Sequence, residues 1–168
     1  MEQVIYRPME RGDIERILAN FPYSIDKQRK LLESYFDDQE RGLRTVVVAD
    51  QGGEVAGYVM LLPSASIGAF RKKNVPAIFG LTVFDKFRRQ GIGTELMNRI
   101  EEAAAKVSDT VCLGVGVHSG DGAAQRLFIK RGYVPDGSGV WCGRQPARPF
   151  DTVESVSVLV LYMSKQIR

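Results

Sequence analysis

The sequence predicts a mixed α/β fold in a single domain that spans residues 1–168. Its length of 168 residues matches one domain of ordinary size. Its composition, 44% hydrophobic and 26% charged residues, is typical of a folded globular chain and argues against disorder. From residue 77 onward, strand-like and helix-like segments alternate, and this order is typical of α/β proteins.

The N-terminal part predicts a strand, two helices and a β-hairpin. The segment Val4–Tyr6 reads as a short strand, and Ile14, Ile17 and Leu18 recur at the spacing of a helix. Residues 26–41 carry scattered apolar side chains among charges, as in an amphipathic helix. The hairpin strands are residues 44–49 and 55–62, joined by the turn sequence Asp50-Gln51-Gly52-Gly53.

The C-terminal part predicts four more strands and two more helices. In the last strand, 158–163, the residues that point to either face are apolar, which indicates that other elements cover both faces of the strand. The irregular segment 143–152 is long for a connection inside a compact domain, and such connections are more often functional. In chain order the other elements are strand 77–84, helix 92–107, strand 110–117, helix 122–131 and strand 133–141.

Composition also argues against several classes of protein. Cys112 and Cys142 show no zinc or disulfide spacing, so no metal site is expected and both thiols are predicted to be buried. The net charge of +3 is mild, and a solvated basic surface is favoured over nucleic-acid binding. Neither a signal peptide nor an apolar run of about 18 residues is present, which predicts a cytoplasmic protein without a membrane partner.

The stretch FDKFRRQGIG, residues 84–93, lies between a predicted strand and a predicted helix. Glycines at such a turn let a ligand approach the backbone, and the free N–H groups of the first helical turn favour an anion such as phosphate. Leu96 excludes the Rossmann glycine pattern, and a Walker lysine is absent. By itself this turn leaves two alternatives open, a phosphate site or a simple helix start.

Arg88-Arg89-Gln90-Gly91-Ile92-Gly93 resembles the [RQ]-x-x-G-x-[GA] signature of the GNAT acyltransferase superfamily. Ala123–Phe128 with Gly132-Tyr133 is similar to the family's A-x-x-L-Y-x-x-x-G-F segment, and Leu81-Thr82-Val83 is similar to its fourth strand. The resemblance implies the GNAT fold, with about seven strands, helices on both faces, and fourth and fifth strands that splay apart.

The resemblance further implies acetyl-coenzyme A as co-substrate. The implied contacts to it are Leu81, Val83, Arg88, Arg89, Gln90, Gly91, Ile92, Gly93, Thr94 and Phe128. In the family, the backbone of the residues matching Leu81 and Val83 binds the pantetheine arm, and the Val83 N–H is the usual donor to the developing oxyanion.

Three positions depart from the family pattern. The segment Ala77–Val83 holds no acid, so the usual glutamate base is missing. His118 is the best replacement, because imidazole changes charge nearest to neutral pH, and a structural role is the alternative. Asp121 is read as a catalytic base, a ligand contact or a helix cap. Phe128 stands where the family has a tyrosine acid, and it is read as a ligand contact or as core.

These observations predict transfer of an acetyl group to the primary amine of a small or amino-acid-like molecule. Two alternatives stay open, a protein N-acetyltransferase and an acyl-coenzyme A binding module without turnover. The acceptor site is expected in segments 21–30 and 143–152, where Arg144 and Arg148 are candidates for binding a carboxylate or phosphate. Formation of a homodimer is left open.

Overall fold

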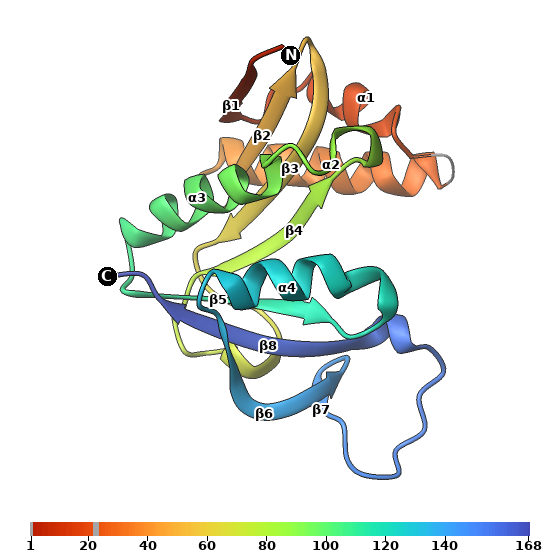
Figure 1. Cartoon of the computed structure of the whole chain (residues 1–168), viewed down its shortest axis with the longest axis vertical. Coiled ribbons are helices and arrows are strands. Elements are labelled where there is room, and N and C mark those ends of the chain that lie inside the picture. Colours follow the sequence, from red (N-terminus) through yellow and green to blue (C-terminus); the bar gives the residue numbers. More distant parts are fainter. Residues whose placement is uncertain (1, 22–23) are drawn as a thin grey trace. The chain divides into compact units, whose positions relative to one another are not determined.

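The computed structural model describes residues 2–21 and 24–168, and within them it forms one mixed sheet of eight strands (Figure 1). The hydrogen-bonded order is β1-β2-β3-β4-β5-β8-β6-β7, and β4 runs parallel to β5. The predicted α/β class is confirmed. The expected number of about seven strands is exceeded, because a two-residue strand, β7, lies inside the segment expected to be irregular.

The elements follow the order expected from the sequence. The strands are β1 (Val4–Pro8), β2 (Thr45–Gln51), β3 (Glu54–Leu62), β4 (Ala77–Val83), β5 (Thr110–Gly116), β6 (Val134–Cys142), β7 (Gln145–Pro146) and β8 (Leu159–Gln166). The α-helices are α1 (Asp13–Leu18), α2 (Ile25–Glu40), α3 (Ile92–Ala105) and α4 (Gly122–Lys130).

The contacts divide the chain into two compact units, each built from two segments. Unit 1 comprises residues 1–62 and 79–103, and unit 2 comprises residues 63–78 and 104–168. Strand β4 begins in unit 2, where Ala77 and Ile78 pair with Cys112 and Leu113 of β5, and its remaining residues belong to unit 1. A single domain over residues 1–168, and the splay of β4 from β5, stay predictions.

In unit 1 the two strands of the hairpin, β2 and β3, are joined by a tight glycine turn. Gly52 and Gly53 have φ angles of 63° and 82°, and left-handed residues at both central positions match the type I′ turn that suits the strand twist. The expected hairpin is confirmed.

Helices cover both faces of the strands in unit 1. Neighbouring residues of a strand point to opposite faces. In β1, Tyr6 places its ring 5.8 Å from the guanidinium of Arg99 in α3, whereas Arg7 forms an ion pair with Asp13 of α1. The inner face of α3 is fully buried through Leu96, Met97 and Ile100.

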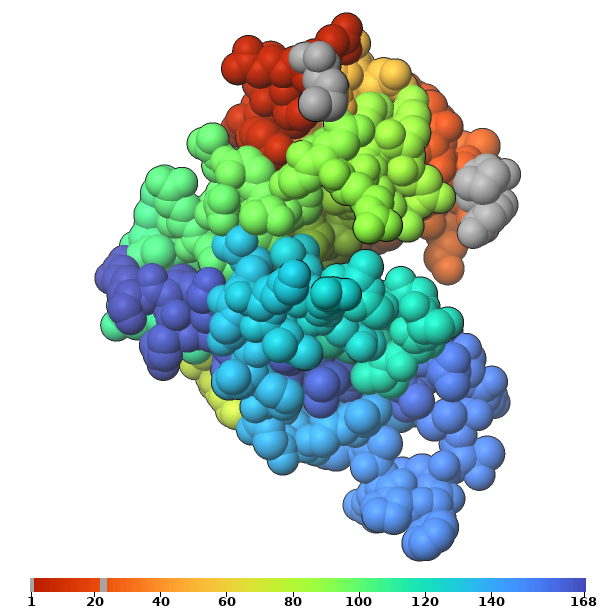
Figure 2. Space-filling model, in the orientation of Figure 1, coloured from red at the N-terminus to blue at the C-terminus, as the bar shows by residue number. Residues whose placement is uncertain are grey.

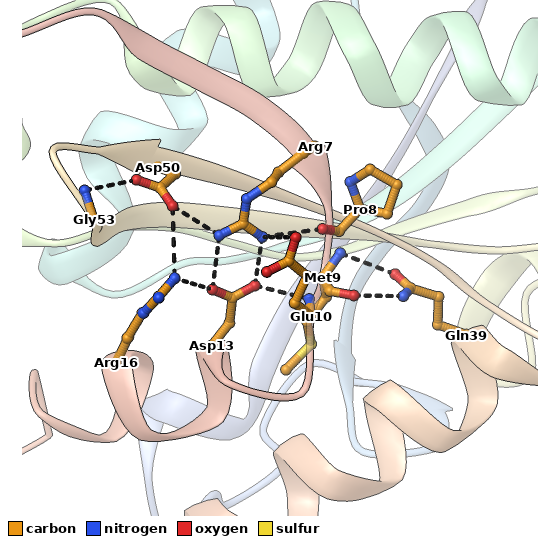
Figure 3. Close-up of polar contacts among 9 residues, drawn as sticks. All are labelled: Arg7, Pro8, Met9, Glu10, Asp13, Arg16, Gln39, Asp50 and Gly53. Atoms are coloured by element: carbon orange, nitrogen blue, oxygen red, sulfur yellow. Dashed lines mark hydrogen bonds and ion pairs between the residues drawn. The ribbon is translucent and has the colours of Figure 1, made fainter.

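Polar contacts fasten β1 to α1 and β2 (Figure 3). Asp13 has no exposed surface, and its carboxylate accepts two hydrogen bonds from Arg7 at 2.7 and 2.9 Å and one from the Glu10 N–H at 2.8 Å. Burial alone would raise the pKa of Asp13, but these hydrogen bonds and the charges of Arg7 and Arg16 outweigh it and hold the pKa below its usual value. Arg7 also bonds Asp50 at 2.7 Å.

In unit 2 the register brings three strand ends together. Strand β8 pairs antiparallel with both β5 and β6, and Val160 near its start lies opposite Gly116 of β5 and Trp141 of β6. Hence the turn that follows β5 and the connection that leaves β6 emerge at the same end of this part of the sheet. Helix α4 packs on β5.

A small aromatic core stabilises unit 2. It contains Phe70, Cys112 and Tyr162, and the Tyr162 ring lies edge-on to Trp141 at 5.5 Å between centroids. Burial raises the pKa of the Cys112 thiol to about 12, so the thiol stays protonated and unreactive at neutral pH. The prediction of a buried thiol is confirmed for Cys112, whereas Cys142 is half-buried.

Candidate active site

The loop from Arg88 to Gly91, which joins β4 to α3 in unit 1, alternates between backbone conformations. Arg88 is extended, Arg89 is left-handed with φ 63°, and Gly91 is left-handed with φ 82°. Turns that contain left-handed residues are among those whose backbone N–H groups bind anions. The loop leads directly into the first turn of α3, whose unsatisfied N–H groups add to the same positive potential.

Aromatic anchors hold the residues that precede this loop. Phe84 and Phe87 are both 8% exposed, and the Phe84 N–H donates to the Ala56 carbonyl of β3 at 3.0 Å. The Phe84 ring lies 6.3 Å from that of Tyr58 between centroids. The residues that precede the loop are therefore fixed by packing and by a hydrogen bond to β3, which favours a preformed site.

The side chains of this loop are mostly exposed, but Arg88 is engaged. Its Nε donates to the Val83 carbonyl at 3.1 Å, and its Nη2 lies 2.9 Å from Asp85. Arg89 forms no ion pair with any residue that the structure describes, so its charge is the one available to a ligand. Gln90 accepts a weak hydrogen bond from Gln51 at 3.4 Å.

Strand β4 is interrupted in its middle. Gly80 has φ 64°, which is foreign to an extended strand and typical of a β-bulge. The Thr82 hydroxyl donates to the Gly80 carbonyl at 3.2 Å and closes the distortion. Leu81 and Val83, which follow the left-handed glycine, are both half-buried.

The other residues of the predicted cofactor set lie at the start of α3. Ile92 is buried and holds the helix on the strands, Gly93 is half-buried, and Thr94 is exposed. The nine predicted contacts from Leu81 to Thr94 thus fall in one segment of unit 1, whereas His118, Asp121 and Phe128 lie in unit 2.

His118 and Asp121 lie together in the turn after β5. His118 Nε2 is 2.9 Å from the Asp121 carboxylate, and His118 Nδ1 accepts the Gly120 N–H at 3.0 Å. An amide N–H only donates, so Nδ1 carries a lone pair, and the ring proton sits on Nε2, where it is donated to Asp121. Both ring nitrogens are therefore occupied in this conformation.

Asp121 occupies the cap position of α4, yet its side chain makes no capping hydrogen bond. Capping was one of the three roles considered for this residue, and the partner of its carboxylate is His118 instead.

Two glycines make room for the His118–Asp121 pair. A Cβ at Gly116 would lie 1.9 Å from the Asp121 carboxylate, and one at Gly120 would lie 2.8 Å from the His118 ring. The side chain of Gln125 in α4 donates to the Gly116 carbonyl at 2.8 Å and fixes the end of β5. The sequence gives no signal for this contact of Gln125, because a polar residue on a helix is ordinarily solvated.

Phe128 is 5% exposed, and its ring packs edge-on against Tyr133 at 5.8 Å between centroids. This packing fits a core residue, and a contact of Phe128 to the co-substrate stays a prediction.

Among residues 2–21 and 24–168, no cluster of three or more histidine, cysteine or acidic side chains is arranged to hold a metal ion. In the same residues, no helix is both long enough and apolar enough to cross a membrane.

A model of the acetyltransferase (GNAT) family matches residues 13–133, which include the Arg88–Gly91 loop and the His118–Asp121 pair. The chain belongs to the GNAT acetyltransferase family. The match ends before β6, so the connection between β6 and β8 lies outside the shared part.

Solved GNAT structures share the fold at low sequence identity. A GNAT-family acetyltransferase from Desulfovibrio desulfuricans has a TM-score of 0.73 and 11% identity, covering 99% of this chain and 100% of its own. A ribosomal-protein-alanine N-acetyltransferase from Brucella melitensis has a TM-score of 0.66 and 21% identity, covering 96% and 99%. An acetyltransferase from Salmonella typhimurium, solved with acetyl-CoA, has a TM-score of 0.67 and 17% identity, covering 98% and 94%. No curated protein matches the chain.

Proposed function

We propose that this protein transfers the acetyl group of acetyl-coenzyme A to the primary amine of a small or amino-acid-like molecule. The observation that carries the proposal is the Arg88–Gly91 loop, with its alternating backbone and its place at the start of α3. A Cβ at Gly91 would meet no atom within 4 Å, so the space above it is open to a pyrophosphate. Arg89, which forms no ion pair with any described residue, adds a positive charge that suits the same ligand.

In the proposed reaction, the neutral amine attacks the thioester carbonyl and the carbon–sulfur bond breaks. The amine loses one proton, and the departing thiolate gains one from water. At neutral pH an amine resembling lysine is almost entirely protonated, so a group must accept its proton. A thiolate is a good leaving group, and the reaction therefore does not require the tyrosine that Phe128 replaces.

The proposed proton acceptor is His118, acting with Asp121 directly or through water. Acceptance at Nδ1 requires the hydrogen bond from Gly120 to open, because Nε2 already carries a proton toward Asp121. The Asp121 carboxylate, 2.9 Å from Nε2, orients the ring. The Val83 N–H remains the proposed donor to the oxyanion, and the proposal places Leu81 and Val83 beside the pantetheine arm.

The test is release of free thiol from acetyl-coenzyme A across a panel of amines that includes amino acids, polyamines and aminoglycosides. We expect turnover with at least one of them, and a product mass increased by one acetyl group. Absence of release with every amine, from protein that binds coenzyme A, would contradict the proposed activity.

A second candidate is a module that binds acyl-coenzyme A without turnover. Two observations favour it. Both ring nitrogens of His118 already have partners, and Phe128 is buried. The same thiol assay separates the two, because only the enzyme releases coenzyme A in proportion to added acceptor. A protein substrate is the variant to test if small amines fail.

We further propose that the protein lies in the cytoplasm and binds neither nucleic acid nor a membrane. Formation of a homodimer stays open. Part of the predicted acceptor segment, residues 22 and 23, lies outside the described residues.

A further inference from the structure

Helix α4 begins directly after the His118–Asp121 turn and lies at the surface of unit 2 (Figure 2, turquoise). Asp121 and Gln125 are four residues apart, which is the spacing of neighbours on one face of a helix. Both side chains reach back to Gly116, the last residue of β5. The start of α4 and the end of β5 are therefore joined through one glycine.

The two side chains contact different parts of Gly116. The Gln125 amide donates to the Gly116 carbonyl at 2.8 Å, a bond that spans nine positions of the chain. The Asp121 carboxylate lies against the α-carbon, since a Cβ there would be 1.9 Å from it. Any shift of the β5 end relative to α4 would therefore change the surroundings of the carboxylate that pairs with His118.

The other hydrogen bonds of the turn join its residues to one another. The Asp121 N–H donates to the His118 carbonyl at 3.0 Å, and the Gly120 N–H donates to His118 Nδ1 at 3.0 Å. His118 Nε2 lies 2.9 Å from the Asp121 carboxylate. These contacts shape the turn, and the bond from Gln125 ties its far side to β5.

We propose that Gln125 is a positioning residue for the His118–Asp121 pair. Its bond to the Gly116 carbonyl holds the start of α4, and with it the Asp121 carboxylate, at the end of β5. Gln125 acts through Gly116 and Asp121 and has no contact of its own with the reacting groups. The inference rests on the proposed function, since it assigns the residue that keeps the proposed proton acceptor in place.

The first experiment observes the histidine ring directly. His118 is the single histidine of the chain, so its two ring nitrogens give unambiguous signals in a nitrogen NMR spectrum of the imidazole. Asp121→Ala removes the carboxylate and supplies the reference spectrum of the broken pair. Gln125→Met keeps the length of the side chain but removes the donor, so we expect both signals to move from the wild-type positions towards that reference.

A second variant and a matched control accompany this measurement. Gln125→Glu has the same length and shape, but it replaces the donor by an acceptor that the Gly116 carbonyl repels, so it should move the signals in the same direction. Arg126→Met changes the next residue of α4, which is exposed, and should leave the spectrum unchanged. Arginine, glutamine and methionine have similar helix propensities, so all these changes preserve the helix itself.

The second experiment measures turnover with the best amine of the thiol-release panel. We expect Gln125→Met to lower kcat ~10-fold or more at unchanged affinity for coenzyme A, because a misplacement of about 1 Å can reduce a rate by ~100-fold. In protein that already carries His118→Ala, the same change should have no further effect, since Gln125 acts through that ring. A residue that only stabilised α4 would lower kcat equally in both backgrounds.

Two results would overturn the proposal. They are nitrogen signals of Gln125→Met and Gln125→Glu that coincide with those of the wild type, or a loss of kcat that is the same with and without His118. The spectra need no substrate and therefore test this inference separately from the reaction. Thiol release by the wild type with unchanged spectra of the variants would refute this inference alone, and shifted spectra without thiol release from any amine would refute the proposed function alone.

Discussion

Replacing Gly91 by alanine separates the backbone role of the Arg88–Gly91 loop from its role in binding. Gly91 has φ 82°, and left-handed backbone costs a residue with a Cβ about 1–2 kcal/mol. No atom lies within 4 Å of the added Cβ, so no clash adds to this cost. For a chain of this size we expect the melting temperature to fall by about 2–8 °C.

The same methyl group would stand in the space assigned to the pyrophosphate. Displacing the phosphate from one charge-assisted hydrogen bond costs about 1.5–3 kcal/mol, which corresponds to roughly 10- to 150-fold weaker binding of coenzyme A. Isothermal titration calorimetry of the folded variant with coenzyme A measures this loss of affinity.

A matched control lies in the same unit. Gly53 in the β2–β3 turn also has φ 82°, and its added Cβ would also meet nothing within 4 Å. Gly53→Ala should therefore lose the same stability and keep full affinity for coenzyme A. Equal affinity in the two alanine variants would refute the assignment of the loop as the pyrophosphate site.

Two further predictions concern the charged groups of each unit. Asp13→Asn should lower the free energy of unfolding in urea by about 1–3 kcal/mol, because it weakens the buried hydrogen bonds to Arg7, which keeps Asp50 as its charged partner. Since the pKa of Asp13 is lowered on folding, its contribution to stability is present above the ordinary carboxyl pKa and is lost as pH falls through the lowered value. The variant should lose that part of the loss of stability in acid. An unchanged dependence of the free energy of unfolding on pH would contradict the argument. His118→Ala should reduce turnover ~100-fold while leaving coenzyme A affinity intact, and activity within about threefold of wild type would assign the residue to the turn alone.

Most of the fold follows from periodicity and turn chemistry in the sequence. The helical spacing of Ile14, Ile17 and Leu18 identifies α1, and all three side chains are buried in it. The glycine pair at 52 and 53 identifies the hairpin, because only residues that tolerate left-handed backbone fit both central positions of its turn. Such signals are local and are therefore readable without the structure.

Contacts between distant residues are not readable in this way. The Arg7–Asp13–Asp50 cluster joins a strand, a helix and a second strand, and Asp50 lies 43 positions from Arg7. Each of these residues alone reads as a solvated charge. Only the pairing of β1 with β2 shows that they converge and that Asp13 is buried.

The left-handed residue in the middle of β4 was readable in principle. An isolated glycine inside a strand pattern is a signal for a bulge, and Gly80 stands in the middle of Ala77–Val83. At Phe150 the signal is reversed, because Pro149 indicates a turn while phenylalanine stands where glycine is usual. Sequence patterns identify residues that favour the fold, and a residue that opposes the local fold becomes visible only when its conformation is known.

The His118 turn shows why residue type alone could not decide its role. A structural histidine and a catalytic one are the same residue in the sequence, and they differ in which ring nitrogen is free. Here the Gly120 N–H fixes the lone pair on Nδ1, and Asp121 fixes the proton on Nε2. In the proposed reaction, proton transfer to His118 would therefore be coupled to opening of the Gly120 hydrogen bond, and the turn that holds the ring would have to open for each proton that the ring accepts.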